Sequence, residues 1–193
     1  PARPAAPRMF SKAWWQISKR YAGALYIHVY QGQPTLSSEP EPDQKSPWWT
    51  EHAIDPELFA SKEFDLELGG VVFTSVFNPY DGRKNWEDLL SAFCNAFADN
   101  EQASLVFKLT HKACTSAIVQ MLKYLARLPQ FRCRVVLLHG YLEDDQYRAL
   151  IHATSFVVNA SYGEGQCLPL MEYLSAGKPA IAPDHSGMSD YID

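Results

Sequence analysis

The sequence predicts an α/β protein in which a doubly wound, mostly parallel sheet follows an N-terminal extension. From residue 70 onward, short apolar segments alternate with amphipathic segments of helical period, which is typical of strands linked by helical crossovers. The apolar segments are mostly continuous, and this indicates strands that are covered on both faces. In sheets of this kind, ligands bind beyond the carboxyl ends of the strands. Residues that directly follow each strand are therefore the candidates for a functional site.

Five strands and four helices follow from this alternation. The predicted strands are Gly70–Phe77, Ser104–Thr110, Cys133–His139, Ser155–Asn159 and Ala180–Ala182. The predicted helices are Trp86–Ala98, Thr115–Leu128, Asp144–Ala153 and Leu168–Ala176. We expect Asn85 and Thr115 to cap the first two helices, because their side chains can accept hydrogen bonds from free backbone amides. Pro169 suits the start of the last helix, and Gly177 suits a left-handed residue just past its end.

The sequence before the main domain, which we place at residues 69–193, has a different composition. Residues 1–50 are predicted to form an extension and linker, with a helix over Ser11–Tyr21 and a strand over Ala24–Tyr30. The strand is followed by a stretch rich in proline, serine and acidic residues. Two tryptophans at residues 48–49 end this stretch. We expect them to pack against other residues, and carbohydrate stacking is the alternative.

Length, charge and cysteine content narrow the function classes. The 193 residues are enough for one full domain and an extension. The net charge of −5, with both signs mixed along the chain, argues against a nucleic-acid partner. The four cysteines show no paired spacing, so we expect buried free thiols and a reducing, cytoplasmic location. No apolar segment approaches the roughly 18 residues of a membrane span, and the N-terminus lacks the apolar core of a signal peptide.

A loop that carries two glycines leads into the last predicted helix. Gly163 and Gly165 flank Glu164 and allow the backbone to approach a ligand closely. The free N–H groups at the start of the helix attract an anion such as a phosphate. Carboxylates at Glu164 and Glu172 can accept hydrogen bonds from neighbouring sugar hydroxyls. Together these groups predict a site for a sugar nucleotide, whereas the alternative is a plain loop, a surface helix and two solvated acids.

Polar residues also follow the other predicted strands. Arg83 and Lys84 come after the first strand, where arginine can hold a phosphate through two hydrogen bonds and lysine as a point charge. An ordinary solvated turn is the alternative for this pair. Lys108 and His111 lie near the end of the second strand, and His111 is interpreted as a surface histidine. Residues 184–187 follow the last strand and are assigned no chemistry.

The stretch from Glu164 to Ile181 resembles the E-x7-E region of retaining glycosyltransferases of family 4, which have the GT-B fold. That family typically reads E-G-F-G-L-P-x-x-E-A-x-A-x-G-x-P-V-I, and this chain reads E-G-Q-C-L-P-L-M-E-Y-L-S-A-G-K-P-A-I. Both acids and the Leu-Pro pair match, whereas Gln166 and Cys167 stand where the family has phenylalanine and glycine. The resemblance implies one half of a GT-B fold, that is, a Rossmann-like sheet.

The resemblance also implies roles for individual residues. The chain would be the donor-binding part of an enzyme that transfers a sugar, of the hexosyl type, from a nucleoside-diphosphate sugar with retention at the anomeric carbon. Glu164 would be catalytic and face the donor sugar, Glu172 would hold the ribose, and cations at residues 83–84 would hold the diphosphate. The other donor-binding residues would be Gly165, Gln166, Cys167 and Leu168, and the possible base pocket would comprise Tyr141 and Leu142.

Further expectations concern what surrounds the donor site. Residues 51–59 resemble the family segment that joins the two GT-B domains, which predicts an interdomain connector over residues 51–68. An acceptor glycan or lipid-linked sugar would bind mostly through an N-terminal domain that is not recognisable here. The sequence has no D-x-D motif, and the resemblance implies no metal and no cofactor besides the donor. The main domain would be truncated at its C-terminus, so the fragment would be inactive alone.

Two other function classes are compatible with the same residues. One is a non-catalytic module that binds a sugar nucleotide or a partner. The other is an epimerase or a phosphorylase with the GT-B fold. Release of free nucleoside diphosphate together with a glycoside would distinguish the transferase from both. The favoured interpretation is a transferase that acts in polysaccharide biosynthesis.

Overall fold

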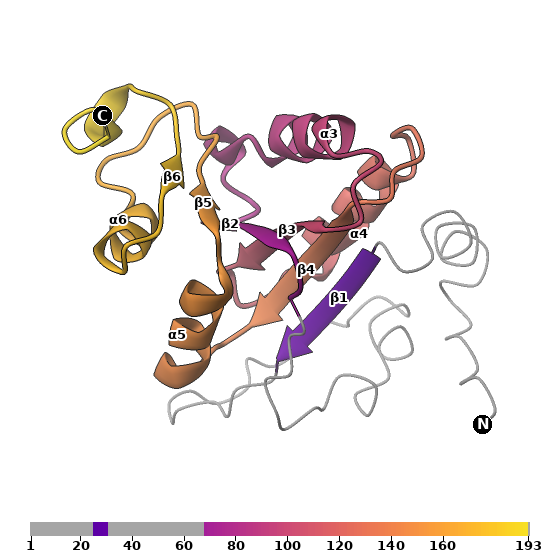
Figure 1. Cartoon of the computed structure of the whole chain (residues 1–193), viewed down its shortest axis with the longest axis horizontal. Coiled ribbons are helices and arrows are strands. Elements are labelled where there is room, and N and C mark those ends of the chain that lie inside the picture. Colours follow the sequence, from indigo (N-terminus) through magenta and orange to yellow (C-terminus); the bar gives the residue numbers. More distant parts are fainter. Residues whose placement is uncertain (1–24, 31–67, 193) are drawn as a thin grey trace, which may run out of the picture.

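The computed structural model describes residues 25–30 and 68–192, which form a six-stranded parallel sheet. The strand order is β1-β4-β3-β2-β5-β6, with β1 at one edge and β6 at the other (Figure 1). The strands are β1 (Leu25–Tyr30), β2 (Val71–Phe77), β3 (Ala103–Leu109), β4 (Arg134–Gly140), β5 (Phe156–Val158) and β6 (Ala180–Ile181). The helices are α3 (Trp86–Ala96), α4 (Thr115–Leu125), α5 (Asp144–Ala153) and α6 (Leu168–Ser175).

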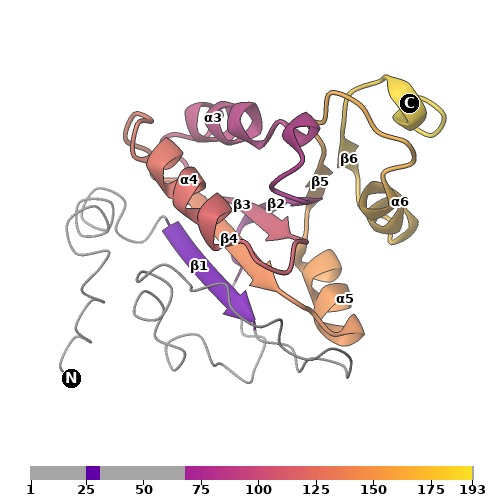
Figure 2. The same ribbon diagram turned by 180° about the vertical axis from the view of Figure 1, so that it is seen from behind.

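Helices cover both faces of this sheet, because successive residues of each strand point to opposite sides. Phe107 of β3 packs in a cluster with residues of α3 and α4, including Leu90 and Met121. Its neighbour Val106 packs on the other face with Leu150 of α5. Figures 1 and 2 show α3 and α4 together on one side of the sheet and α5 on the other. The predicted doubly wound, Rossmann-like α/β fold is confirmed.

The first strand of the chain, β1, belongs to the main sheet. Sequence analysis predicted a strand over Ala24–Tyr30 but placed it in the extension. In the structure it is β1, which pairs in parallel with β4 from Leu25 opposite Val135 to Tyr30 opposite Gly140. The predicted helix over residues 11–21, the linker with its two tryptophans, and the connector up to residue 67 lie outside the described residues.

Two of the predicted helix caps are wrong. Asn85 precedes α3 but has a left-handed backbone (φ 51) and makes no capping hydrogen bond with its side chain. Its side-chain oxygen instead accepts a hydrogen bond from the Tyr162 hydroxyl at 2.9 Å. Thr115 is the first residue of α4, and Cys114 holds the cap position. At α6, Pro169 lies in the first turn and Gly177 follows the helix end with φ 75, as predicted.

The structure shows the state of the four cysteines. All four cysteines are free; Cys94, Cys114 and Cys133 are buried, whereas Cys167 is only half-buried. Within residues 25–30 and 68–192, no helix combines the length and the apolar character that a bilayer crossing requires.

The start of β2 generates a first prediction. Gly70 has φ 78, and a Cβ atom there would lie 2.1 Å from the Gln102 carbonyl oxygen, which accepts a hydrogen bond from the Val71 amide. We expect Gly70→Ala to lower the free energy of unfolding by roughly 1–3 kcal/mol, because the backbone must shift and a left-handed alanine is strained. Urea unfolding measures this. Gly69→Ala is the matched control, since a Cβ there meets nothing within 4 Å. Equal losses in the two variants would contradict the explanation.

Candidate functional site

Two loops meet at the carboxyl edge of the sheet because β2 and β5 are neighbouring parallel strands. One loop connects β2 to α3 and contains a short 3-10 helix, Gly82–Lys84; the other connects β5 to α6. The Tyr162 amide donates to the Arg83 carbonyl at 2.8 Å. In return, Arg83 Nη1 donates to the Gly163 carbonyl at 2.6 Å. The two loops therefore form one surface.

Glu164 lies where the two loops meet. Its side chain is only 4% exposed, and its carboxylate accepts from Lys84 Nζ at 2.5 Å and from Arg83 Nη1 at 2.6 Å. The Ser161 hydroxyl donates to Oε1 at 2.6 Å. Short, charge-assisted hydrogen bonds of this type are among the stronger polar contacts in proteins. Arg83 and Lys84, the predicted diphosphate ligands, thus both contact Glu164, the predicted ligand of the donor sugar.

The environment of Glu164 keeps its carboxyl group ionised. Burial raises the pKa of Glu164, but hydrogen bonds from Lys84, Ser161 and Arg83 outweigh burial and lower the pKa to about 2. Near neutral pH the group is therefore a hydrogen-bond acceptor and has no proton to donate.

Asp81 is a partner in this cluster that sequence analysis missed. Its Oδ2 lies 2.8 Å from Arg83 Nε, and its Oδ1 accepts the Arg83 amide at 3.3 Å. The available signal was the spacing, because an aspartate often bonds to the backbone two residues ahead in a turn. Arg83 is thereby shared between two acids, and the hydrogen bond to Glu164 raises the pKa of its guanidinium. Within the cluster, the charges of Asp81 and Glu164 balance those of Arg83 and Lys84.

The backbone that enters α6 is left-handed at a position where this chain departs from the family pattern. Cys167, which stands where the family has glycine, has a left-handed backbone with φ 50. Glycine adopts this conformation without strain, and a cysteine does so at some cost. The Cys167 thiol is anchored by Asn159, whose Nδ2 donates to Sγ at 2.9 Å. The same amide lies 3.4 Å from Glu164 Oε1, so Cys167 is linked to the cluster through Asn159.

The two loop glycines are not required by the packing of the described residues. Neither Gly163 nor Gly165 has a positive φ, and a Cβ atom added to either would meet nothing within 4 Å. By contrast, a Cβ at Gly187 would lie 1.5 Å from the Gly165 carbonyl oxygen. The Gly187 amide donates to the Glu164 carbonyl at 3.1 Å, and the Ser186 hydroxyl accepts the Glu164 amide at 3.0 Å. The 3-10 helix Ser186–Met188 therefore supports the loop.

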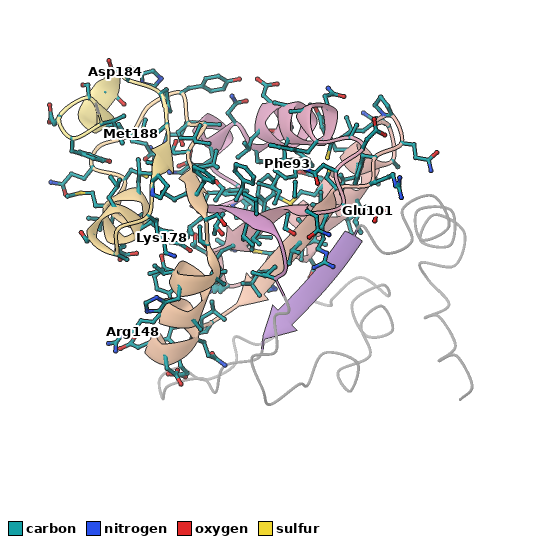
Figure 3. All side chains as sticks on the ribbon, viewed as in Figure 1. Phe93, Glu101, Arg148, Lys178, Asp184 and Met188 are labelled. Atoms are coloured by element: carbon teal, nitrogen blue, oxygen red, sulfur yellow. The ribbon has the colours of Figure 1, made fainter. Side chains whose placement is uncertain are left out.

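The other candidates on α6 are more exposed than expected. Leu168 is 61% exposed, and Glu172 lies one turn later on the same helix face. The apolar neighbours of Glu172 in the sequence predict a half-buried carboxylate, but Glu172 is exposed in the structure, and its Oε2 accepts the Tyr147 hydroxyl of α5 at 2.8 Å. The opposite side of α6 supplies the apolar anchor, where Tyr173 packs with Met188, which is labelled in Figure 3. Among the described side chains, no hydrogen bond joins Glu172 to Glu164.

The turn after β4 separates the two residues proposed for a base pocket. Tyr141 is 63% exposed, so its ring is not packed in the core at the end of the strand. Leu142 is 8% exposed and packs with Val136 and Leu150 in the core.

His111, interpreted as a surface histidine, is half-buried and lies edge-on against the Tyr80 ring with centroids 4.8 Å apart. Gln166 is exposed, and its carbonyl accepts the Tyr191 hydroxyl at 2.5 Å.

Comparisons with known proteins found a family and a similar solved structure. Residues 70–193 match the family described as Glycosyl transferases group 1. The chain is similar to the crystal structure of the C-terminal domain of a glycosyl transferase group 1 family protein, LpcC, from Francisella tularensis. That similarity has a TM-score of 0.47 and 17% identity, and it covers 68% of this chain and 71% of the other. Comparison with curated proteins gave no match.

The cluster predicts how stability depends on pH. The pKa of Glu164 is about 2 in the folded protein and 4.5 in the reference state, so its contacts contribute stability that is full above pH 4.5 and is lost as the pH falls toward 2. We expect Glu164→Gln to reduce the stability difference between about pH 6 and about pH 3 by on the order of 1–2 kcal/mol. Urea unfolding at both pH values measures it.

A control separates this effect from the loss of any ion pair. Glu101→Gln breaks a contact with Arg132 in which both side chains are more than half exposed. Exposed pairs contribute little, so this variant should keep nearly full stability at about pH 6. Glu164→Gln should be destabilised there, because it leaves Lys84 with only 13% exposure and no anionic partner among the residues that the structure describes. An unchanged pH profile in Glu164→Gln would refute the role of the cluster.

Proposed function

Because the chain belongs to the family Glycosyl transferases group 1, we propose that it is the donor-binding part of a retaining GT-B glycosyltransferase of family 4. The observation that carries the proposal is the Arg83–Glu164–Lys84 cluster, which lies where the carboxyl ends of β2 and β5 lead into α3 and α6. Ligands of doubly wound sheets bind at this edge. The donor class is a nucleoside-diphosphate sugar, and a separate domain supplies most of the acceptor site.

The diphosphate binds at the two cations and at the start of α6. Arg83 is 46% exposed and can turn toward a ligand, whereas Lys84 is 13% exposed and provides a fixed charge. Because Asp81 and Glu164 already pair with these cations, the diphosphate shares them with the carboxylates. The backbone amides near Cys167 and Leu168 donate further hydrogen bonds to the diphosphate. In this proposal they are not shared with a carboxylate.

Glu164 acts as an acceptor and as a support for the cations. Its depressed pKa, about 2, excludes it as a proton donor near neutral pH. A carboxylate has about four lone-pair positions, so it can also accept a hydroxyl of the donor sugar when that hydroxyl approaches from the open side of Gly163 and Gly165. Glu164 would then orient the sugar and hold Arg83 and Lys84 at the diphosphate.

The proposed reaction breaks the bond between the anomeric carbon and the diphosphate oxygen, and the electron pair leaves with the nucleoside diphosphate. Arg83, Lys84 and the α6 amides stabilise the developing negative charge. An acceptor hydroxyl forms the new bond on the same face of the sugar. The products are a glycoside of unchanged anomeric configuration, nucleoside diphosphate and a proton. No metal ion takes part in this proposal.

Lys84 provides the first test of the phosphate role. We expect Lys84→Ala to weaken pyrophosphate binding at least about tenfold, because a charge-assisted contact is lost. Calorimetric titration with EDTA present measures the affinity, and a need for added Mg²⁺ would contradict the metal-free proposal. Lys123→Ala on the exposed side of α4 is the matched control and should bind as the wild type does. Equal affinity in Lys84→Ala and Lys123→Ala would rule out the phosphate site.

Glu172 tests the nucleoside end of the donor. We expect Glu172→Ala to weaken binding of the nucleoside diphosphate several-fold and to leave pyrophosphate binding unchanged, because only the ribose hydroxyls lose an acceptor. UDP, GDP and ADP are first ranked by thermal shift, and the best of them is titrated. Asp99→Ala, at an exposed carboxylate beyond α3, is the control. A loss of pyrophosphate affinity in Glu172→Ala would show that the residue acts on the phosphates or on the fold.

A further inference from the structure

A lysine is buried in β3, the strand next to β2, and the carboxyl end of β2 leads into the candidate site. Lys108 lies near the carboxyl end of β3 and is 6% exposed. Its register partners are Val76 of β2 and Leu138 of β4, so it points to the same face as the apolar cluster beneath α5. Burying an ammonium group is unfavourable, and burial lowers the pKa of Lys108 to about 8. A residue of this type at an otherwise apolar position requires a reason.

The contacts of the ammonium group supply that reason. Lys108 Nζ donates to the Leu109 carbonyl at 3.0 Å and to the Gly140 carbonyl at 2.7 Å. Both acceptors are the last residues of neighbouring strands. Within residues 25–30 and 68–192, no carboxylate forms an ion pair with Lys108. The cation is therefore directed at the strand ends and not at an acidic partner in this part of the chain.

The bond to Gly140 fixes the turn at residues 140–142. Gly140 has φ 114, in the region that favours glycine, so the chain changes direction sharply there. Tyr141 then projects outward with 63% exposure, and Leu142 returns to the core. The orientation of Tyr141 thus depends on the backbone on either side of it. Lys108 binds the carbonyl of the preceding residue, Gly140, and the following residue, Leu142, is anchored in the core.

We propose that Lys108 is a positioning residue that holds the 140–142 turn so that the Tyr141 ring is presented to the nucleobase of the donor. The proposal rests on the proposed function, because it assigns a task to the base end of the same ligand. Lys108 touches no part of the donor; it acts through the Gly140 carbonyl. An aromatic ring held in place stacks on a base more strongly than a mobile one, since less ordering is needed on binding.

The test compares Lys108→Met with the wild type, because methionine has a similar length and no donor. Amide exchange of the peptide that covers residues 139–143 should become at least about tenfold faster, which shows that the turn is released. The best-binding nucleoside diphosphate should bind about fivefold to tenfold more weakly, and pyrophosphate should bind as before. Ser104→Ala, on the same face of β3 and fully buried, is the control for a change in the core.

Tyr141→Ala and the double variant decide whether Lys108 acts through the ring. If it does, adding Lys108→Met to Tyr141→Ala weakens nucleotide binding by less than about twofold. Unchanged exchange, unchanged nucleotide affinity, an equal loss of pyrophosphate affinity, or additive losses in the double variant would each overturn the inference. If the wild type binds neither nucleotide nor pyrophosphate, the proposed function itself fails. If it binds both and Lys108→Met binds them equally well, the inference alone fails.

Discussion

The contact between Glu164 and the two cations of the neighbouring loop is the interaction on which the site depends. A buried carboxylate without partners would be strongly unfavourable, and here three side chains satisfy it. The same contact joins the loop after β2 to the loop after β5, which are about 80 residues apart in the sequence. The sheet must therefore fold before the site can form. The site in turn connects the two loops at the carboxyl ends of β2 and β5.

Support for the cluster comes from segments to which sequence analysis gave no role. The 3-10 helix at Ser186–Met188 packs so closely against the loop that only a glycine fits at residue 187. Asn159 links the cluster to the left-handed Cys167, and α6 begins directly after it. These contacts fix the loop backbone and leave the side chains of Arg83 and Leu168 exposed. A fixed loop backbone with exposed side chains is suited to reversible ligand binding.

The sequence was sufficient for features that depend on local pattern. The continuous apolar segments predicted the strands from β2 to β6, and Gly177 marked the end of α6, since these signals lie within the segment itself. Long-range contacts could not be predicted in this way. The Tyr162 hydroxyl donates a hydrogen bond to the Asn85 side chain, which therefore does not cap α3. The pairing of β1 with β4 joins residues more than 100 positions apart. Positions after the strands indicate Arg83, Lys84 and Glu164 as site residues, but they do not predict that both cations pair with Glu164.

In the proposed donor site, the balance of charge at Asp81, Arg83, Lys84 and Glu164 has a consequence for the kinetics of donor binding. An uncompensated basic pocket attracts anions over a distance, and its association rate falls as ionic strength rises. Here each cation already has a carboxylate within 3 Å, so little positive potential extends into solvent. Encounter with the donor should then be governed by ordinary diffusion and depend only weakly on salt, and the selectivity for phosphate should arise after contact, when the diphosphate and the carboxylates share Arg83.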